Sequence, residues 1–492
     1  MTATIRSILV RTHARTCSSL VLLSSLLVAG CSQDSSTGPS APNAVMSRES
    51  GGRTSDLRSV LREAGFTGRV GLTLEARLGR PIDREVAELG RMLWFDPFTG
   101  LNNDNSCGGC HSPSNGFGDT QSIAIGIDNN GIVGPDRRGP RNQRRTPMAI
   151  NTAFFPTLMW NSRFFSASGD PFDNSLGFMF PPPEGRSLSY LSHLLQAQAF
   201  IPPTERTEAA GFKVPGTSHD LRQAVLDRLN GNRAYRQLFA SAFADLRHGG
   251  LITFDHFGHA IAEFEFTLVF ANAPIDRFAR GESEAMSQSQ KAGALLFFGR
   301  AGCVQCHAVS GQSNEMFSDF RQHVAGIPQV APSHANVIFD GPGANEDFGL
   351  EQVSGRPGDR YLFRTSPLRN VGLQPAFMHN GAFVRLEDAL RYHLDARTQG
   401  SAYTTAALAS DLRGPTGPIA PVLNRLDPLL RRPVMLSEVE FAAMVDFLRY
   451  GLLDPAARPN ELRGLVPSTL PSGRPGFRFQ FPEGRRSSLT DR

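Results

Sequence analysis

The sequence predicts a mainly α-helical protein made of two similar units joined by long irregular segments. Several segments carry apolar residues at helical spacing, and residues 80–97 are a clear example. In two places a predicted helix leads directly into a Cys-x-x-Cys-His motif, at residues 107–111 and 303–307. Residues 308–360 and 395–433 are rich in Gly and Pro, which predicts irregular structure there.

The ends of these helices follow from local chemistry. The first helix ends at an Asp-Pro pair before the first motif, and Gly and Asn then dominate residues 100–135, which predicts a loop. In the last helix Ser437 is the expected cap, Glu438 and Glu440 occupy the first turn, and Gly451 closes the helix. Further helices are expected at residues 187–200, 219–229, 233–246 and 254–271 and, immediately before the second motif, from residue 287 onward.

The composition is that of a globular protein with a small charge imbalance. Of the 492 residues 40% are apolar and 20% are charged, and the formal net charge is +4. Lys and Arg form no sustained block beyond the N-terminal segment, so we expect no nucleic-acid partner.

The N-terminal segment has the features of an export signal. Arg6, Arg11 and Arg15 precede "SSLVLLSSLLVAGC", an apolar stretch too short to cross a membrane as a stable helix. Its end resembles a bacterial lipobox, in which Cys31 would carry lipid, although an ordinary cleaved signal is the alternative. Residues 1–30 are therefore expected to be a signal peptide and residues 31–56, which are rich in Ser, Pro and Gly, a flexible tether. These features predict a periplasmic, lipid-anchored protein.

The positions of the six cysteines indicate the cofactor. Cys17 and Cys31 belong to the export segment, and the other four are Cys107, Cys110, Cys303 and Cys306, all within the two motifs. A zinc site or a redox disulfide would use the paired cysteines but would not require His111 and His307 directly behind them. Covalent c-type haem requires both thiols and the adjacent histidine as iron ligand, so we predict two haem c groups.

The order of the motifs resembles bacterial di-haem cytochrome c peroxidases and the related MauG enzymes. The matching segments are "LGRMLWFDP", "RTPMAIN", "MWNSR", "EFEFTL", "LFFGRAGCVQCH", "FRTSPLRNV", "MHNGAF" and "LEDALRYH". The resemblance implies a mainly α fold with two cytochrome c-like haem domains that face each other and carry long irregular loops. It predicts an N-terminal peroxidatic haem domain at residues 57–280, an electron-transfer haem domain at residues 281–452 and an irregular tail at residues 453–492.

The same resemblance implies catalytic residues. Trp160 falls where the family keeps a tryptophan between the haems, although core packing is the alternative for a buried indole. Glu208 falls at the acid that moves a proton between the two oxygens of peroxide, with Glu205 as its competitor. Gln198 is a second polar group expected in that pocket.

Two departures from the classical pattern predict a MauG-like subtype. Ile125 aligns with the histidine that blocks the first haem in classical members, so this haem is expected to be five-coordinate or water-bound, without a need for reductive activation. His393 falls where classical members place an axial Met and MauG a Tyr, which predicts a second haem with two His ligands. Tyr392 is the alternative ligand, and His379 is expected to contact a propionate or backbone.

The resemblance gives calcium only weak support. Arg145 stands where the family has an Asn ligand, and Asn142 lies nearby. Haem propionates or solvent are the expected contacts of the arginine cluster, which comprises Arg137, Arg138, Arg141, Arg144 and Arg145.

The predicted function is reduction of hydrogen peroxide by a di-haem c-type peroxidase. Its partner would be a small redox protein or cytochrome donor, or a protein substrate, and it would contact the membrane only through the lipid anchor. The alternatives are a non-catalytic di-haem electron carrier and a MauG-like oxidase that modifies a partner protein.

Overall fold

The computed structural model describes residues 56–180 and 186–482. The predicted signal peptide and Cys31 lie outside these residues, as does all but the last position of the predicted tether. Within the described residues helices predominate, and the strands are only two or three residues long, so the mainly α prediction is confirmed. No helix in this part of the chain is both long and apolar enough to cross a bilayer.

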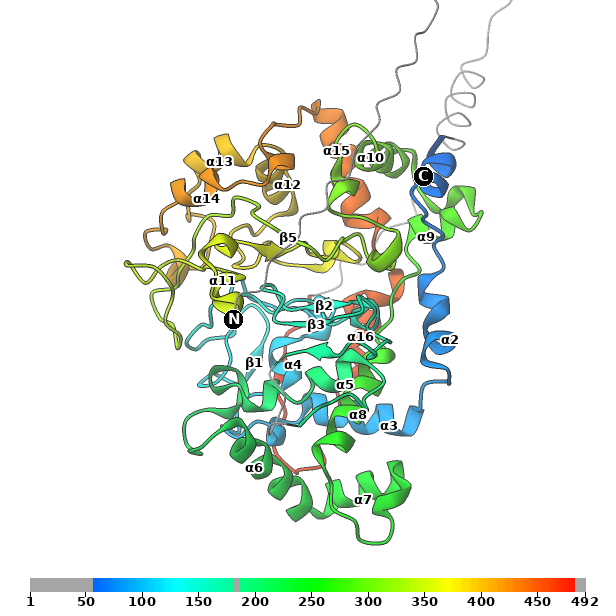
Figure 1. The fold of residues 1–492 in the computed structure, drawn as a ribbon, viewed down its shortest axis with the longest axis vertical. Helices are drawn as coiled ribbons and strands as arrows, with labels where there is room; N and C mark the ends of the chain where they lie inside the picture. Colours follow the sequence, from blue (N-terminus) through cyan, green and yellow to red (C-terminus); the bar gives the residue numbers. More distant parts are fainter. Residues whose placement is uncertain (1–55, 181–185, 483–492) are drawn as a thin grey trace, which may run out of the picture. The chain divides into compact units, whose positions relative to one another are not determined.

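The elements alternate with irregular segments along the chain (Figure 1). Residues 56–63 are helical. The other helices are α2 Leu74–Leu78, α3 Arg84–Phe95, α4 Cys107–Cys110, α5 Leu194–Gln198, α6 Ser218–Gly231, α7 Arg233–Ala242, α8 Phe254–Phe266, α9 Pro274–Ala279, α10 Gln288–Phe298, α11 Glu351–Ser354, α12 Leu386–Leu394, α13 Ala396–Ala402, α14 Ala420–Asn424, α15 Glu438–Asp446 and α16 Pro459–Leu462. The strands are β1 Ile132–Val133, β2 Thr157–Leu158, β3 Phe164–Ser166, β4 Phe178–Met179, β5 Gln322–His323, β6 Phe363–Arg364 and β7 Arg478–Phe479.

The helices before the two motifs each use a glycine to pack closely on a partner helix. In α3 the stretch from Gly90 to Phe95 reads "GRMLWF", and in α10 the stretch from Gly293 to Phe298 reads "GALLFF". Helix α3 packs on α8, and α10 packs on α15 (Figure 1). A Cβ atom at Gly90 would lie 1.8 Å from the Ala260 carbonyl oxygen of α8. At Gly293 it would lie 2.1 Å from the Ala443 oxygen of α15. Glycine therefore lets both helix pairs approach backbone to backbone.

Each helix pair belongs to a separate apolar core. The first core contains Leu93, Trp94 and Phe264, and the second contains Phe297 and Phe447. The second core also takes in Leu57 and Phe66 from the beginning of the described chain. Because the cores interleave along the sequence, the domain boundaries at residues 280 and 452 stay predictions.

The end of the chain returns to the first core. Strand β7 pairs in parallel with β1, with Ile132 opposite Arg478. The Phe479 ring centre lies 5.7 Å from that of Phe95, at the end of α3. The Ser472 hydroxyl donates to Asp96 Oδ1 over 2.8 Å. The tail, expected to be irregular, thus forms short elements and covers the approach to the first motif.

Several predicted helix boundaries are confirmed, and others are wrong. The Ser437 hydroxyl accepts from the backbone N–H of Glu440, as expected for a cap, and the helical segment closes at Gly451. The helix predicted at residues 187–200 is limited to α5, because the His193 side chain caps it by accepting from the N–H of Leu195. Residues 395–433, predicted as irregular, contain α13 and α14.

Replacement of either glycine by alanine should separate its helix pair. We expect Gly90→Ala and Gly293→Ala each to lower the free energy of unfolding by about 1–3 kcal/mol, the usual cost of overpacking a core. Gly231→Ala is the matched control, because no atom lies within 4 Å of the position that a Cβ atom would take on this helical glycine. Urea denaturation followed by circular dichroism measures the difference, and equal midpoints for all three variants would contradict the argument.

Candidate functional site

A first cavity of about 370 Å³ lies beside the first Cys-x-x-Cys-His motif. Its wall contains Cys107, Cys110 and His111 together with residues that are far apart in sequence. The predicted site residues in this wall are Trp160, Gln198, Glu205 and Glu208. The structure therefore brings the predicted catalytic residues and the first attachment motif to one cavity.

His111 is held with one ring nitrogen turned into the protein. The motif cysteines form the single turn of α4, and His111 follows directly as its C-cap. Its Nδ1 lies 3.1 Å from the carbonyl oxygen of Phe117, so the Nδ1–H tautomer donates there. Burial lowers the pKa of His111, which favours the neutral imidazole. Nε2 is then left as a lone-pair donor, the form in which histidine binds a metal.

The second motif repeats this arrangement beside a second cavity of about 280 Å³. Cys303, Cys306 and His307 are in its wall. His307 Nδ1 lies 3.0 Å from the carbonyl oxygen of Phe317, and burial is the main reason that its pKa falls to about 4. Phe117 and Phe317 both have positive φ, 54° and 58°, so each carbonyl is presented by a left-handed residue. The two motifs therefore prepare their histidines in the same way.

His393 faces His307 across the second cavity. The two ring centres are 6.3 Å apart, and His393 lies in the last turn of α12. A metal–imidazole bond is about 2 Å long and the ring centre lies about 1 Å beyond the nitrogen, so two rings on opposite sides of one metal are about 6 Å apart. The alternative ligand, Tyr392, is outside the cavity wall and donates its hydroxyl to the Gly326 carbonyl.

Trp160 belongs to the walls of both cavities. Its indole N–H donates to the Arg145 carbonyl over 2.9 Å, and its own carbonyl accepts from the N–H of Arg364 over 2.8 Å. Arg145 and Arg364 also line both cavities. The tryptophan is thus fixed by backbone contacts in the wall that the two cavities share.

The two arginines of this shared wall are buried cations. Burial lowers the pKa of each to about 10, and within the described residues neither forms a salt bridge with a carboxylate. Arg145 donates to the carbonyls of Gln121 and Asp119, and Arg364 to that of Met159. Buried guanidinium groups normally have anionic partners, and the carboxylates of a bound haem would supply them.

Glu208 lies in a single turn of π-helix, Arg206–Ala210, on the first cavity. Burial, followed by the nearby Glu205, raises the pKa of Glu208 to about 7, although Arg163 opposes this. Arg163 also pairs with Glu205, with Nη1 3.0 Å from Oε1. A carboxyl with a pKa near neutral can both accept and release a proton during one reaction cycle.

A second acid of the same cavity was not predicted from the sequence. Phe257, Ile261 and Glu265 recur every four residues along α8 and line the first cavity. Glu265 is 5% exposed, and its Oε2 has no hydrogen-bond partner among the residues that the structure describes. Burial raises its pKa to about 8. The available signal was an acid at the position that continues the four-residue spacing of Phe257 and Ile261 in a strongly apolar helix.

The two cavities differ in their titratable groups. Within the described chain three glutamates line the first cavity, and no Asp or Glu lines the second. His111 is the only histidine in the first wall, whereas the second contains His307, His323, His379 and His393. Ile125, expected at the first haem, has its neighbour Ala124 in the wall instead. The first cavity is equipped to move protons, and the second to ligate metal.

The arginine cluster is divided between several roles. In the described part of the chain, Arg144 and Arg145 are the only members of this cluster that line either of the two cavities. Arg137 donates to backbone carbonyls, including that of Ile125, and Arg141 pairs with Asp411. Asn142 lies in the first wall, and its Oδ1 has no hydrogen-bond partner. The weak support for calcium is therefore unchanged, and Cys31 lies outside the described residues.

The sequence is similar to known di-haem proteins. The profile of the family described as "Di-haem cytochrome c peroxidase" matches residues 84–284. Methylamine utilization protein MauG of Methylorubrum extorquens is 28% identical over 317 residues, which cover 64% of this chain and 70% of that protein. Cytochrome c551 peroxidase of Pseudomonas aeruginosa is 27% identical over 312 residues, which cover 63% and 72% respectively.

Solved structures share the fold. A MauG-like protein associated with microbial copper homeostasis matches with a TM-score of 0.54 and 20% identity, covering 80% of this chain and 93% of that one. The diheme peroxidase BthA from Burkholderia thailandensis matches with a TM-score of 0.50 and 19% identity, covering 81% and 92%.

Burial of Glu265 should make stability depend on pH. Its pKa is raised from 4.5 to about 8 in the folded protein, so its contribution to stability is complete below pH 4.5 and is lost as pH rises through 8. We expect Glu265→Gln to flatten the fall in unfolding free energy over this interval. Urea titrations of the haem-loaded protein at several pH values measure the slope, and Glu284→Gln, which removes an exposed acid, should leave it unchanged.

Proposed function

We propose that the chain is a member of the di-haem cytochrome c peroxidase and MauG family and reduces hydrogen peroxide at an open first haem; the family profile matches residues 84–284, and MauG and cytochrome c551 peroxidase are among the relatives. The observation that carries this proposal is the division of groups between the cavities. Three glutamates and a single histidine line the first cavity, and facing histidines without any Asp or Glu line the second, within the described chain.

The residues of both cavities fit a covalent haem c. Cys107 and Cys110 would hold the first haem, with His111 as its ligand, and Cys303, Cys306 and His307 would do the same for the second. The guanidinium groups of Arg145 and Arg364 have no carboxylate partner among the described residues, which supports carboxylate-bearing groups in both cavities. When bound, haem supplies an iron that takes an axial ligand and exchanges electrons.

Glu208 is proposed to carry the proton in the first cavity. Cleavage of the O–O bond requires the transfer of a proton from one peroxide oxygen to the other, and a carboxylate can accept and then return it. The pKa of about 7 that burial gives Glu208 suits both steps. The Gln198 amide, in the same wall, would orient the substrate by hydrogen bonding.

The lack of a second histidine in the described wall of the first cavity supports an open first haem site. Ile125, which aligns with the blocking histidine of classical members, has no ligating atom and lies outside the cavity wall, and the described residues of the wall include no histidine other than His111. A site of this kind would meet peroxide without prior reduction of the second haem, as proposed for the MauG-like subtype. The complete reaction consumes hydrogen peroxide, two protons and two electrons and forms two water molecules.

His393 is proposed as the second axial ligand of the second haem. The 6.3 Å between the ring centres of His307 and His393 supports one metal between them, and the placement of the Tyr392 hydroxyl on Gly326 disfavours the alternative. Two cytochrome c-like domains would then face each other across Trp160, whose indole borders both cavities and would relay electrons.

The location and partner are part of the proposal. We propose a periplasmic, lipid-anchored protein that takes electrons from a small redox protein or cytochrome. A protein substrate is the alternative source of electrons, as in an oxidase that modifies its partner. MauG and cytochrome c551 peroxidase among the relatives support either a protein partner or peroxide as substrate.

Loss of the proposed proton carrier tests the function. Glu208→Gln should slow the spectral change that follows addition of peroxide to the fully oxidised protein by about 10²–10⁴-fold. In the parent protein the rate should fall as pH drops below about 7, because a protonated Glu208 cannot accept the proton. Stopped-flow spectroscopy measures both effects.

Glu205→Gln is the matched control for this experiment. It keeps Glu208 and removes the neighbouring charge that raises the pKa of Glu208, so the pH midpoint should move lower while the limiting rate is retained. A parent protein that exchanges electrons but does not react rapidly with peroxide would instead be the non-catalytic carrier.

Removal of His393 tests the second haem. His393→Ala should convert the second haem from low-spin to high-spin, and added imidazole should restore the low-spin spectrum by entering the vacated position. Electron paramagnetic resonance measures the spin state. Tyr392→Phe is the control and should keep the parental spectrum, whereas a low-spin signal that survives in His393→Ala would rule out this ligand.

A further inference from the structure

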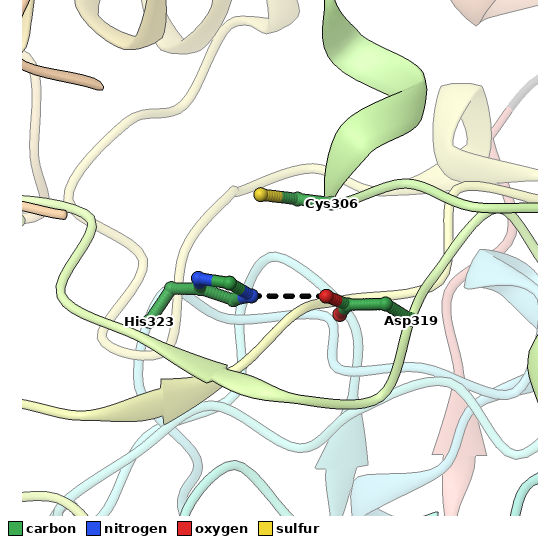
Figure 2. Close-up of side chains that lie close together, drawn as sticks. All are labelled: Cys306, Asp319 and His323. Atoms are coloured by element: carbon green, nitrogen blue, oxygen red, sulfur yellow. Dashed lines mark hydrogen bonds and ion pairs between the residues drawn. The ribbon is translucent and has the colours of Figure 1, made fainter. Parts of the chain in front are cut away.

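An ionic cluster adjoins the second motif, outside the set of predicted haem ligands. His323, in β5, has both ring nitrogens bound to carboxylates: Nε2 lies 3.0 Å from Asp319 Oδ2, and Nδ1 lies 2.8 Å from Asp427 Oδ2. Figure 2 shows the bond from His323 to Asp319, with the Cys306 sulfur beside the pair. We name Asp319, His323 and Asp427 the imidazolium cluster.

The imidazolium cluster is tied to the second motif and to the wall of its cavity. The Asp319 N–H donates to the Cys306 carbonyl over 2.7 Å, and the Asp427 N–H donates to the Val324 carbonyl over 3.0 Å. His323 itself lines the second cavity, and so do Leu429 and Leu430, which follow Asp427. The cluster thus joins two segments of the cavity wall that are about a hundred residues apart in sequence.

This geometry does not suit a metal site. Atoms of Cys306, Asp319 and His323 lie within 4.8 Å of one another, which would suit a metal ion if the thiol were free. In a haem c protein, however, Cys306 is a thioether and has no thiolate to offer. Both His323 nitrogens already face carboxylates, so the ring acts as a double hydrogen-bond donor.

The charge of the cluster follows from its contacts. Hydrogen bonds to the carboxylates of Asp319 and Asp427 raise the pKa of His323 above its usual value despite its burial. The imidazole is therefore protonated at neutral pH, and with two carboxylates the cluster carries one net negative charge. The side chains of all three residues are less than one-fifth exposed, so water screens this charge only in part.

We propose that the imidazolium cluster sets the reduction potential of the second haem through this fixed charge; the inference rests on the proposed function only in requiring a haem at Cys303 and Cys306. The cavity wall otherwise carries the positive charges of Arg145, Arg364 and Arg432, since Arg369, also in the wall, is paired with Asp276. A positive surrounding favours the reduced iron, and the cluster opposes it. The positive charge of His323 offsets one of the two carboxylate charges, so one net negative charge still acts on the haem potential.

Two substitutions change the charge of the imidazolium cluster in opposite directions. Asp427→Asn removes a negative charge and should raise the potential of the second haem. His323→Gln removes the positive charge, leaves two carboxylates and should lower it. We expect each variant to change the ratio of reduced to oxidised haem at a fixed potential by about tenfold, the scale of one partly screened charge nearby.

Spectroelectrochemical titration of the haem-loaded protein measures both haems in one experiment, and the first haem is the internal reference. Asp388→Asn, which makes the same charge change as Asp427→Asn on the exposed side of α12, should shift the potential much less. Haem content and circular dichroism establish that each variant is folded.

Opposite shifts confined to the second haem support the proposal. Shifts of the same sign, shifts as small as that of Asp388→Asn, or equal shifts at both haems would overturn it, because a purely structural role predicts no dependence on the sign of the charge. Loss of the second haem from both variants would also overturn it in favour of a structural role. The measurement needs no peroxide, so a protein without peroxidase activity would still show the predicted shifts.

Discussion

The hydrogen bond from each motif histidine to a backbone carbonyl is the constraint on which both cavities depend. It engages Nδ1–H of His111 and of His307, so Nε2 of each ring keeps the lone pair that could bind a metal. The acceptors, Phe117 and Phe317, are fully buried and adopt left-handed conformations that cost about 1–2 kcal/mol each. Two cores that contain many aromatic residues hold these carbonyls in place, so packing around Phe117 and Phe317 would fix the orientation of each proposed ligand. Trp94 and Phe297, at equivalent positions of the two helices, complete the support with ring centres 5.5 and 6.3 Å from the histidine rings.

The wall that the two cavities share is held in place by different contacts from those of the motif histidines. Trp160 is positioned by backbone contacts with Arg145 and Arg364 rather than by side-chain partners, so its placement does not depend on a particular protonation state. The two guanidinium groups are buried without a described carboxylate partner, an arrangement that is costly unless an anion completes it. Haem binding and formation of this wall are therefore expected to be coupled. Because of this coupling, Trp160 would be aligned for electron transfer only when both haems are bound.

Local patterns in the sequence predicted a large part of this site. The spacing within each motif predicted Cys107, Cys110 and His111 and their counterparts. The resemblance to the family predicted Trp160 and Glu208. All of these residues line one or both of the cavities. Features that depend on distant contacts were not predicted. The partner of His323 is Asp427, and no local pattern connects these residues. Glu265 was hidden because an acid in a helix is normally exposed, and only the packing of α8 shows that it faces inward. The helix at residues 187–200 was predicted too long because capping by His193 decides its start.

The distribution of acids shows how two similar units could perform different tasks. Both contain a glycine-mediated helix pair, a Cys-x-x-Cys-His turn and an anchored imidazole, so the haem attachment itself does not distinguish them. The difference arises from the opposite wall. Helix α8 brings Glu265, and the π-helical turn at Arg206–Ala210 brings Glu208, to the first cavity, whereas α12 brings His393 to the second. A wall that carries protonatable acids suits cleavage of the O–O bond. A wall with ligating histidines and no acid among the described residues suits electron storage. An iron with both axial positions filled and a fixed charge nearby would rearrange little when its oxidation state changes. The asymmetry of function would thus reside in three short helical segments, while the symmetric parts supply the scaffold.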